Sequence, residues 1–285
     1  MAEDNRLPEI LRTVAAMQRQ SAAWRGAGQR IALVPTMGAL HEGHLDLVRA
    51  AGKAAHRVIV SIFVNPTQFA PTEDLAAYPR DESADLRKLA PLGVDAVFAP
   101  TVVEMYPQGF ATRISVEGPA LGLESDVRPH FFGGVATVVA KLFIACAPDV
   151  AVFGEKDYQQ LLVVRRMAAD LGLPVSVVGH STIRAADGLA LSSRNAYLSP
   201  GERAVASRLH ATLQKTAAAI RTGALDADAL TAARHDLAAA GFLVDYVALR
   251  NAGTLAEVND TRTEPLRLLA AARLGKTRLI DNIAV

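Results

Sequence analysis

The sequence is poor in the features that mark secreted or nucleic-acid-binding proteins. Its 285 residues include one cysteine, Cys146, which cannot form an internal disulfide, so nothing indicates an oxidising compartment. Thirty basic and twenty-nine acidic side chains give a formal charge of +1, which provides no overall attraction for nucleic acid or an anionic membrane. We therefore expect a cytoplasmic protein with no nucleic-acid or membrane partner, in which any phosphate site is local.

Long uninterrupted hydrophobic runs are also missing. Residues 1–12 contain charged side chains and no apolar core of signal-peptide length. The most apolar stretch, residues 135–153, is interrupted by Lys141, Pro148 and Asp149, so it predicts a buried helix followed by a strand instead of a membrane span. With 51% hydrophobic residues, the chain can bury one large core or two modest ones.

The first part of the chain alternates apolar, β-branched runs with helical segments, which is typical of βαβ units. The runs are residues 31–34, 58–64, 94–99, 150–153 and 175–178. Because they are almost continuously apolar, we expect a central parallel sheet covered on both faces, in a Rossmann-like α/β domain. Ligands of such sheets bind beyond the carboxyl ends of the strands, where residues 35–44, 65–69 and 154–160 would emerge.

The pattern changes after Ile183 to alanine-rich helical stretches at residues 202–220 and 226–240. An alternating run at residues 242–248 and two later strand candidates, near Leu266 and Leu279, follow them. We predict a Rossmann-like domain over residues 1–182 and a smaller α+β domain over residues 183–285.

Two histidines, His41 and His44, stand where the first strand pattern gives way to a helical one. If both lie on the first helical turn, their spacing puts them on one face, beside unpaired amide donors and the positive end of the helix dipole. Phosphates bind well at such a position. The same pair could be a surface feature, a satisfied core pair or half of a metal site, but no second histidine pair at ligand spacing accompanies it, so we assign no metal ligand.

Two amides, Asn65 and Gln68, follow the second strand pattern. Neutral amides suit a substrate with hydroxyl and carboxylate groups, because they can both donate and accept hydrogen bonds. Turn formation alone would explain Asn65 beside Pro66, whereas it explains Gln68 less well.

A third segment joins a strand end to a helix start and contains Gly154, Glu155, Lys156 and Asp157. Lys156 is a flexible point charge suited to phosphates, and Asp157 could cap the helix or accept from ribose hydroxyls. An exposed charged turn would also explain these residues. Gln160, one turn beyond Asp157, would point toward the same crevice as Gln68.

The fourth segment follows Asp187 and Gly188, a turn signal that predicts a short hairpin. Two hydroxyls beside a guanidinium make a plausible polyphosphate clamp, although serines beside an arginine are common in surface loops. The residues are Leu191, Ser192, Ser193 and Arg194.

Taken together, the four segments resemble the pantothenate synthetase family of AMP-forming pantoate-beta-alanine ligases, over nearly the whole chain. Further matches are Glu73-Asp74-Leu75, Tyr78-Pro79-Arg80, Gly134-Val135, Ala186-Asp187-Gly188, and Arg278-Leu279-Ile280-Asp281-Asn282. The wider kinship is with nucleotidyltransferases that share the His-x-Gly-His turn. The resemblance implies condensation of pantoate with beta-alanine through a pantoyl adenylate, with release of AMP and pyrophosphate in coenzyme A biosynthesis.

The resemblance also implies roles for individual residues. His44, His41, Lys156 and Arg194 would be catalytic, with His44 acting as a proton donor or as a hydrogen-bond donor to phosphate. Gln68 and Gln160 would hold pantoate, together with Asn65, and Gln68 would also meet beta-alanine. The implied ATP contacts are Met37, Gly38, His41, Gly43, His44, Gly154, Glu155, Lys156, Asp157, Ile183, Leu191, Ser192, Ser193 and Arg194. Mg²⁺ would be carried on the phosphates, and the resemblance implies a homodimer.

Two positions depart from the family pattern. Phe131 stands where the family usually has histidine, and His130 lies one place earlier, so a slide of one residue or a role in shaping a lid are alternatives. Ser181 replaces a common proline, which we expect to be structurally minor. Competing hypotheses are a transferase that adenylates another acid and an inactive nucleotide-binding module. The presence of His41, His44, Lys156 and Arg194 argues against the inactive module.

Overall fold

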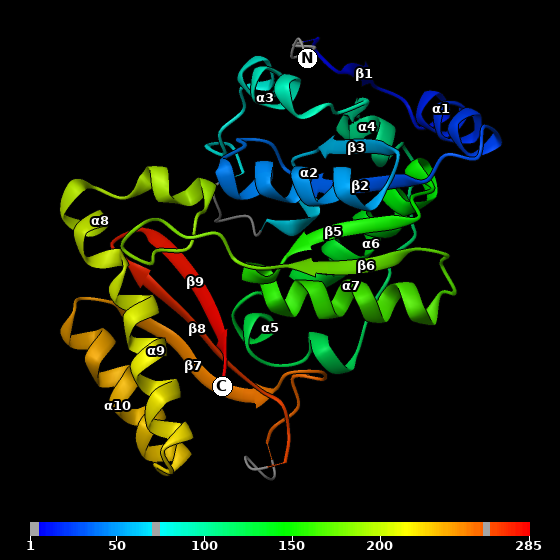
Figure 1. The fold of residues 1–285 in the computed structure, drawn as a ribbon. Helices are drawn as coiled ribbons and strands as arrows, with labels where there is room; N and C mark the ends of the chain where they lie inside the picture. The colour runs from blue at the N-terminus through cyan, green and yellow to red at the C-terminus, as the bar shows by residue number, and fades with distance from the viewer. Residues whose placement is uncertain (1–5, 70–74, 259–262) are drawn as a thin grey trace. The chain divides into compact units, whose positions relative to one another are not determined.

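Within residues 6–69, 75–258 and 263–285, which the computed structural model describes, six parallel strands form one sheet (Figure 1). Its order is β1-β4-β3-β2-β5-β6. The five predicted runs form five of these strands; the other, β1, is three residues long and too short to show a pattern. The strands are β1 (Glu9–Leu11), β2 (Ile31–Thr36), β3 (Arg57–Ile62), β4 (Ala96–Phe98), β5 (Val150–Gly154) and β6 (Ser176–His180).

Both faces of this sheet are covered, as the continuous apolar runs predicted. Ala32 and Val34 of β2 belong to a core cluster with Val48 and Ala51 of α2, while Leu33, on the other face, is equally buried. Helix α2 packs against β2, β3 and β5, and α1 and α6 pack against each other and against β2. The helices here are α1 (Val14–Gly26), α2 (Glu42–Ala54), α3 (Glu82–Leu89), α4 (Val102–Met105), α6 (Phe131–Cys146) and α7 (Tyr158–Asp170).

The strand order places the predicted ligand segments at a topological switch point. From β2 the chain continues through β3 toward one edge of the sheet, and it later returns through β5 on the other side of β2. Strands β2 and β5 pair directly, with Ala32 opposite Val150. The turn after β2 and the turn after β5 therefore leave from neighbouring strand ends, where ligands of open α/β sheets bind.

A second sheet is antiparallel and has the order β7-β8-β9 within the described residues. Its strands are β7 (Leu243–Asn251), β8 (Leu266–Leu274) and β9 (Thr277–Ala284), and the helices are α5 (Glu124–Val127), α8 (Pro200–Ala206), α9 (Arg208–Arg221) and α10 (Asp226–Ala239). Leu209 and Leu213 of α9, Leu237 of α10 and Leu268 of β8 share one core cluster and are almost fully buried. This confirms the prediction of an α/β fold with a smaller α+β part at its C-terminal end.

Contacts divide the chain into two compact units. Unit 1 comprises Met1–Val116, Arg128–Glu155 and Val163–Ser181; unit 2 comprises Glu117–Val127, Lys156–Leu162 and Thr182–Val285. The domain boundary near residue 182 stays a prediction, because these units follow contacts and unit 2 also includes two earlier segments. Glu73 and Asp74, which contributed to the family resemblance, lie outside the described residues.

Candidate active site

The two histidines lie at the start of α2, as predicted. His41 is the N-cap residue and His44 the third helical residue. His41 Nδ1 accepts a hydrogen bond from the Gly43 amide at 3.1 Å, and His44 Nδ1 accepts from the His41 amide at 3.4 Å. A neutral imidazole that accepts at Nδ1 carries its proton on Nε2. Each neutral ring therefore presents an Nε2–H donor, and the ring centroids are 4.1 Å apart.

The turn that leads to these histidines is held by a carboxylate that the sequence did not single out. Asp85 of α3 is 2% exposed, and its oxygens accept from the amides of Ala39 at 2.9 Å and Leu40 at 2.7 Å. Lys88 donates to the Leu40 carbonyl at 2.6 Å. Burial raises the pKa of Asp85 although both amides act in the opposite direction. The turn geometry is therefore imposed from another helix.

Gly38 in this turn is required by both its conformation and its surroundings. Its φ of +80° lies in the left-handed region that favours glycine, and a Cβ there would lie 3.1 Å from an Asp85 oxygen. Its amide donates to Thr36 Oγ1 at 3.1 Å. Met37, which lies between these residues, lines a cavity of about 380 Å³.

The Asn65 side chain is committed to internal contacts. Asn65 is 1% exposed; its Nδ2 donates to Gln68 Oε1 at 2.9 Å and to the Gly134 carbonyl at 3.2 Å. Its Oδ1 accepts from Tyr106 at 2.8 Å and from Thr67 Oγ1 at 2.9 Å. Turn formation thus explains Asn65, as the sequence suggested, but the contact with Gln68 also fixes the orientation of the second amide.

Gly134 of α6 allows the helix to approach this turn. A Cβ at Gly134 would lie 2.5 Å from the Thr67 carbonyl oxygen, a distance that no side chain could occupy without movement of the backbone. Helix α6 packs directly on the short 3₁₀ turn Pro66–Gln68. The Gly134-Val135 match to the family pattern therefore has a local packing reason.

Phe131, at the position of the usual family histidine, is the first residue of α6. The Arg128 guanidinium lies 4.0 Å from the centre of its ring, and Arg128 donates to the Gln68 carbonyl at 2.7 Å. His130 precedes the helix, and its buried Nε2 has no hydrogen-bond partner among the described residues. Phe131 thus supports an arginine that holds the Gln68 backbone, while no role is assigned to His130.

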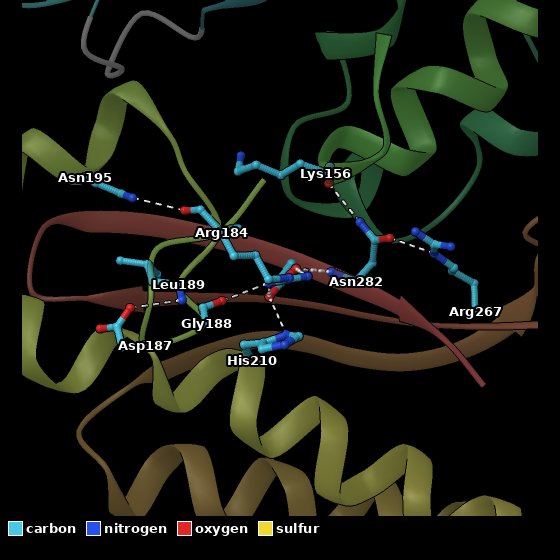
Figure 2. A network of polar contacts seen from close by, with 11 residues as sticks. Lys156, Arg184, Asp187, Gly188, Leu189, Asn195, His210, Arg267 and Asn282 are labelled. Carbon is cyan, nitrogen blue, oxygen red and sulfur yellow. Dashed lines mark hydrogen bonds and ion pairs between the residues drawn. The ribbon is translucent and has the colours of Figure 1, made fainter. Parts of the chain in front are cut away.

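The segment after β5 forms a 3₁₀ turn, Glu155–Asp157, ahead of α7. The Lys156 ammonium is 4.0 Å from the Asp157 carboxylate, with 19% of its side chain exposed. The Lys156 carbonyl accepts from Asn282 of β9 at 2.9 Å (Figure 2). The sequence did not predict this contact, although Asn282 belongs to the closing motif that contributes to the family resemblance.

Two glutamines, Gln159 and Gln160, follow Tyr158 on the first turn of α7, and their environments differ. Gln159 is 5% exposed; it accepts from the Glu124 amide at 3.1 Å and donates to the Pro119 carbonyl at 3.1 Å. Gln160 is partly exposed. Gln159 is thus structural, and Gln160 remains the candidate for substrate binding.

The predicted hairpin is present around Asp187 and Gly188. Arg184 and Ala190 form an antiparallel bridge, and the Leu191 amide donates to the Ile183 carbonyl at 2.9 Å. Ile183 and Leu191, both predicted ATP contacts, are therefore neighbours across its open end.

The serines and arginine of the fourth segment form the start of a 3₁₀ helix, Ser193–Tyr197. Ser192 caps this helix, and its Oγ accepts from the Arg194 amide at 3.3 Å. Ser193 and Arg194 are partly exposed. The segment is therefore an ordered turn with hydroxyl and guanidinium groups at a helix start.

The described residues lack two further features. No three histidine, cysteine or acidic side chains gather there in a way that could hold a metal ion. No helix among them is long and apolar enough to cross a membrane.

Comparison with known proteins identifies the family. The model of the pantoate-beta-alanine ligase family matches residues 9–284. The chain belongs to this family. Among curated ligases of the family, the pantothenate synthetase of Mesorhizobium japonicum is 60% identical over 279 residues, which cover 98% of each chain. Pantothenate synthetase 2 of Bradyrhizobium diazoefficiens is 58% identical over 282 residues, which cover 99% of this chain and all of that one.

Solved structures of the ligase family share the fold. Pantothenate synthetase from Thermus thermophilus superposes with a TM-score of 0.90 at 48% identity, and the match covers 96% of this chain and 98% of that one. The Francisella tularensis ligase, in a complex described as containing beta-gamma ATP and beta-alanine, gives a TM-score of 0.80 at 32% identity over 97% of each chain. The predicted family and its pantothenate-forming ligase activity are thereby confirmed.

Proposed function

We propose that this ligase works in two steps, with ATP, pantoate and beta-alanine as its small-molecule partners. In the first step a pantoate carboxylate oxygen attacks the α-phosphorus of ATP, the bond to the bridging oxygen breaks, and pyrophosphate leaves with the electron pair. In the second step the beta-alanine nitrogen attacks the acyl carbon, loses a proton and expels AMP. The overall reaction forms one amide bond and consumes one ATP.

The observation that carries this proposal is the reciprocal capping of His41 and His44. Both imidazoles accept main-chain amides at Nδ1, so both neutral rings offer Nε2–H donors at a helix N-terminus. Charge develops on the phosphates as pyrophosphate leaves, and donors fixed in advance stabilise it without reorganisation. One such donor contributes about 3 kcal/mol at the transition state.

The remaining phosphate contacts are assigned to Lys156, Ser192, Ser193 and Arg194, with Met37, Gly43, Gly154, Glu155, Asp157 and Ile183 around the nucleotide. Lys156 supplies a point charge and Arg194 a planar fork, which are the two cationic groups that best bind phosphate oxygens. Mg²⁺ is assigned to the triphosphate as part of the substrate, because it usually binds through phosphates and keeps several waters. It would neutralise phosphate charge there.

Pantoate is assigned to Gln68 and Gln160. Gln68 Oε1 accepts from Asn65, so the Gln68 amide presents Nε2 as its donor. Asn65 would act by holding Gln68 in place, since its own polar atoms are already paired. Beta-alanine would reach the acyl carbon beside Gln68.

The decisive experiment is pantoate-dependent exchange of labelled pyrophosphate into ATP, which reports the first step alone. We expect exchange with pantoate in the absence of beta-alanine, and pantothenate formation when beta-alanine is added. The runner-up, adenylation of another acid on the same ATP turn, predicts exchange with that acid and none with pantoate. His44→Ala and Lys156→Ala should each lower exchange by about two powers of ten, in line with loss of a transition-state donor.

A homodimer, which the family resemblance implies, and a cytoplasmic location, which the composition favours, stay predictions. Sedimentation equilibrium of the purified chain tests the first: a mass near twice 30.2 kDa supports a dimer, and a mass of 30.2 kDa contradicts it. Fractionation of cells that express the chain tests the second.

A further inference from the structure

Strand β9 carries two neighbouring polar residues, Asp281 and Asn282, which are both buried at 3% exposure. They lie opposite Ala270 and Leu269 of β8. Because successive side chains of a strand point to opposite faces, these two leave β9 in opposite directions. One strand thereby contacts two separate segments of unit 2.

On one face, Asp281 binds the base of the hairpin that precedes Ser192. Arg184 donates to both oxygens of Asp281, at 2.7 and 2.8 Å, in a two-point ion pair. The same guanidinium donates to the Gly188 carbonyl at 3.0 Å and so closes the hairpin turn (Figure 2). His210 Nδ1 of α9 lies 3.3 Å from the Asp281 carboxylate.

The hairpin in turn positions residues 191–194, the serine and arginine segment. A Cβ at Gly188, whose φ is +91°, would lie 2.9 Å from His210 Cδ2, so α9 packs against the turn. Asn195 donates to the Ala190 carbonyl at 3.0 Å. Residues 191–194 therefore lie between two residues, Ala190 and Asn195, that this hydrogen bond holds together.

On the other face, Asn282 binds the peptide that carries Lys156. Its Nδ2 donates to the Lys156 carbonyl at 2.9 Å, and its Oδ1 accepts from Arg267 Nε at 2.7 Å. The Arg267 guanidinium lies 4.0 Å from the centre of the Tyr158 ring, at the start of α7. Both ends of the Asn282 amide are therefore used, which fixes the Lys156 backbone to β9.

We propose that Asp281 and Asn282 are positioning residues for adenylation. They attach the Lys156 turn and the turn of residues 192–194 to the same strand, β9. The inference deepens the proposed function and rests on it, since both turns are assigned there to the triphosphate. Neither residue is assigned a contact with substrate. Displacement of a catalytic group by about 1 Å can cost about a hundredfold in rate, so the anchors would affect the step that uses the triphosphate.

The test compares the two half-reactions in the full-length protein. Asn282→Asp keeps the shape and the acceptor for Arg267 but places an acceptor against the Lys156 carbonyl. Asp281→Asn removes the charge that pairs with Arg184. We expect each variant to lower pyrophosphate exchange about tenfold to a hundredfold and to raise the KM for ATP. The reaction of supplied pantoyl adenylate with beta-alanine, which needs no triphosphate, should change less than about twofold because only the triphosphate turns are displaced.

Asp236→Asn is the matched control, because Asp236 pairs with Lys215 at 2.6 Å on an exposed surface of the same unit. If Asn282→Asp does not fold, Asn282→Ala, which removes the donor without adding a charge, takes its place. Equal loss in both half-reactions would show that the residues only support the fold and would overturn the inference. Unchanged exchange would overturn it as well.

Calorimetric titration with ATP separates this inference from the proposed function. Weaker ATP binding in Asn282→Asp and Asp281→Asn supports positioning, even if the wild-type chain adenylates an acid other than pantoate. ATP binding equal to that of the wild type in both variants contradicts positioning. Absence of pantoate-dependent exchange in the wild type would instead contradict the proposed function.

Discussion

Asn65 donates from Nδ2 to Gln68 Oε1 at 2.9 Å, so one buried amide fixes the orientation of another. Aspartate at position 65 would place a carboxylate oxygen where Nδ2 now donates. Two acceptors, this oxygen and Gln68 Oε1, would then face each other. Reversal of a buried hydrogen bond costs about 1–3 kcal/mol, which corresponds to roughly a tenfold to hundredfold change in an equilibrium constant.

We therefore expect Asn65→Asp to raise the KM for pantoate about tenfold or more, with a smaller change in the KM for ATP. Initial rates at varied pantoate and varied ATP measure both. Thr67→Val is the control, because it removes the 2.9 Å contact to Asn65 Oδ1 while the amide pair remains. A larger effect of Asn65→Asp on ATP than on pantoate would contradict this assignment.

Variants of His41 and His44 can separate the capping of α2 from catalysis. His41→Asn keeps a good N-cap residue, and His44→Gln keeps a side-chain amide that can reach the His41 backbone. We expect both variants to retain the wild-type melting temperature within a few degrees, because α2 stays capped.

Pyrophosphate exchange should nevertheless fall by about two powers of ten in His41→Asn, since the Nε2–H donor is lost. His44→Gln tests the role of the second ring: a loss of about tenfold or less indicates hydrogen bonding to phosphate, which an amide can replace. A loss as large as that in His44→Ala indicates proton donation, which an amide cannot supply. Wild-type exchange in His41→Asn would contradict its catalytic role.

Asp85 of α3 is expected to affect catalysis through the histidine turn, whose amides it holds. Asp85→Ala leaves the buried amides of Ala39 and Leu40 without an acceptor, at a cost of about 1–3 kcal/mol each. We expect a lower free energy of unfolding in urea, and at least about a tenfold loss of exchange because the histidine turn shifts.

The control is Asp81→Ala, which removes the exposed N-cap of the same helix. It should cost about 1 kcal/mol of stability and leave exchange near the wild-type rate. Equal catalytic losses in the two variants would show that α3, and not the carboxylate of Asp85, controls the turn.

Asp281 should make the protein sensitive to acid. Burial alone would raise its pKa, but the contacts with His210 and Arg184 and the Asn282 amide outweigh burial and hold the pKa of Asp281 below its ordinary value. A carboxyl whose folded pKa is depressed adds stability above its unfolded pKa of about 3.9 and loses it as the pH falls through the folded value.

The difference in unfolding free energy between wild type and Asp281→Asn should thus shrink as the pH falls below about 4. Urea titrations from about pH 3 to pH 7 measure it. Asp236→Asn should differ little from wild type throughout, because exposed ion pairs contribute little. A constant difference across the range would contradict this account of Asp281.

The local structure of the candidate site's main segments could be predicted because each segment is contiguous in the sequence. The run from Ile31 to Ala51 contains a buried strand, a glycine break and a helical repeat, and the structure places His41 at the N-cap of α2 and His44 on its first turn. The Asp187-Gly188 signal likewise gave the hairpin, with Gly188 at a positive φ. Both follow from backbone preferences within a few residues.

The residues that hold these segments could not be predicted, because their partners are distant in sequence. Asp85 binds an amide 45 positions away, and Asn282 binds the carbonyl of a residue 126 positions away. Arg128 reaches Gln68 across 60 positions, and its contact with Phe131 gave the departure from the family pattern a packing role. No local pattern distinguishes these side chains from ordinary surface charges or amides.

The amino-acid sequence by itself determined the order of strands and helices, the turns between them and the groups they carry, since periodicity and glycine or proline breaks act over one or two turns of chain. Tertiary structure alone decided which distant carboxylate or amide fixes each of those turns. Burial of a polar side chain is favourable only when a partner meets it, and the fold, not the neighbouring residues, supplies that partner.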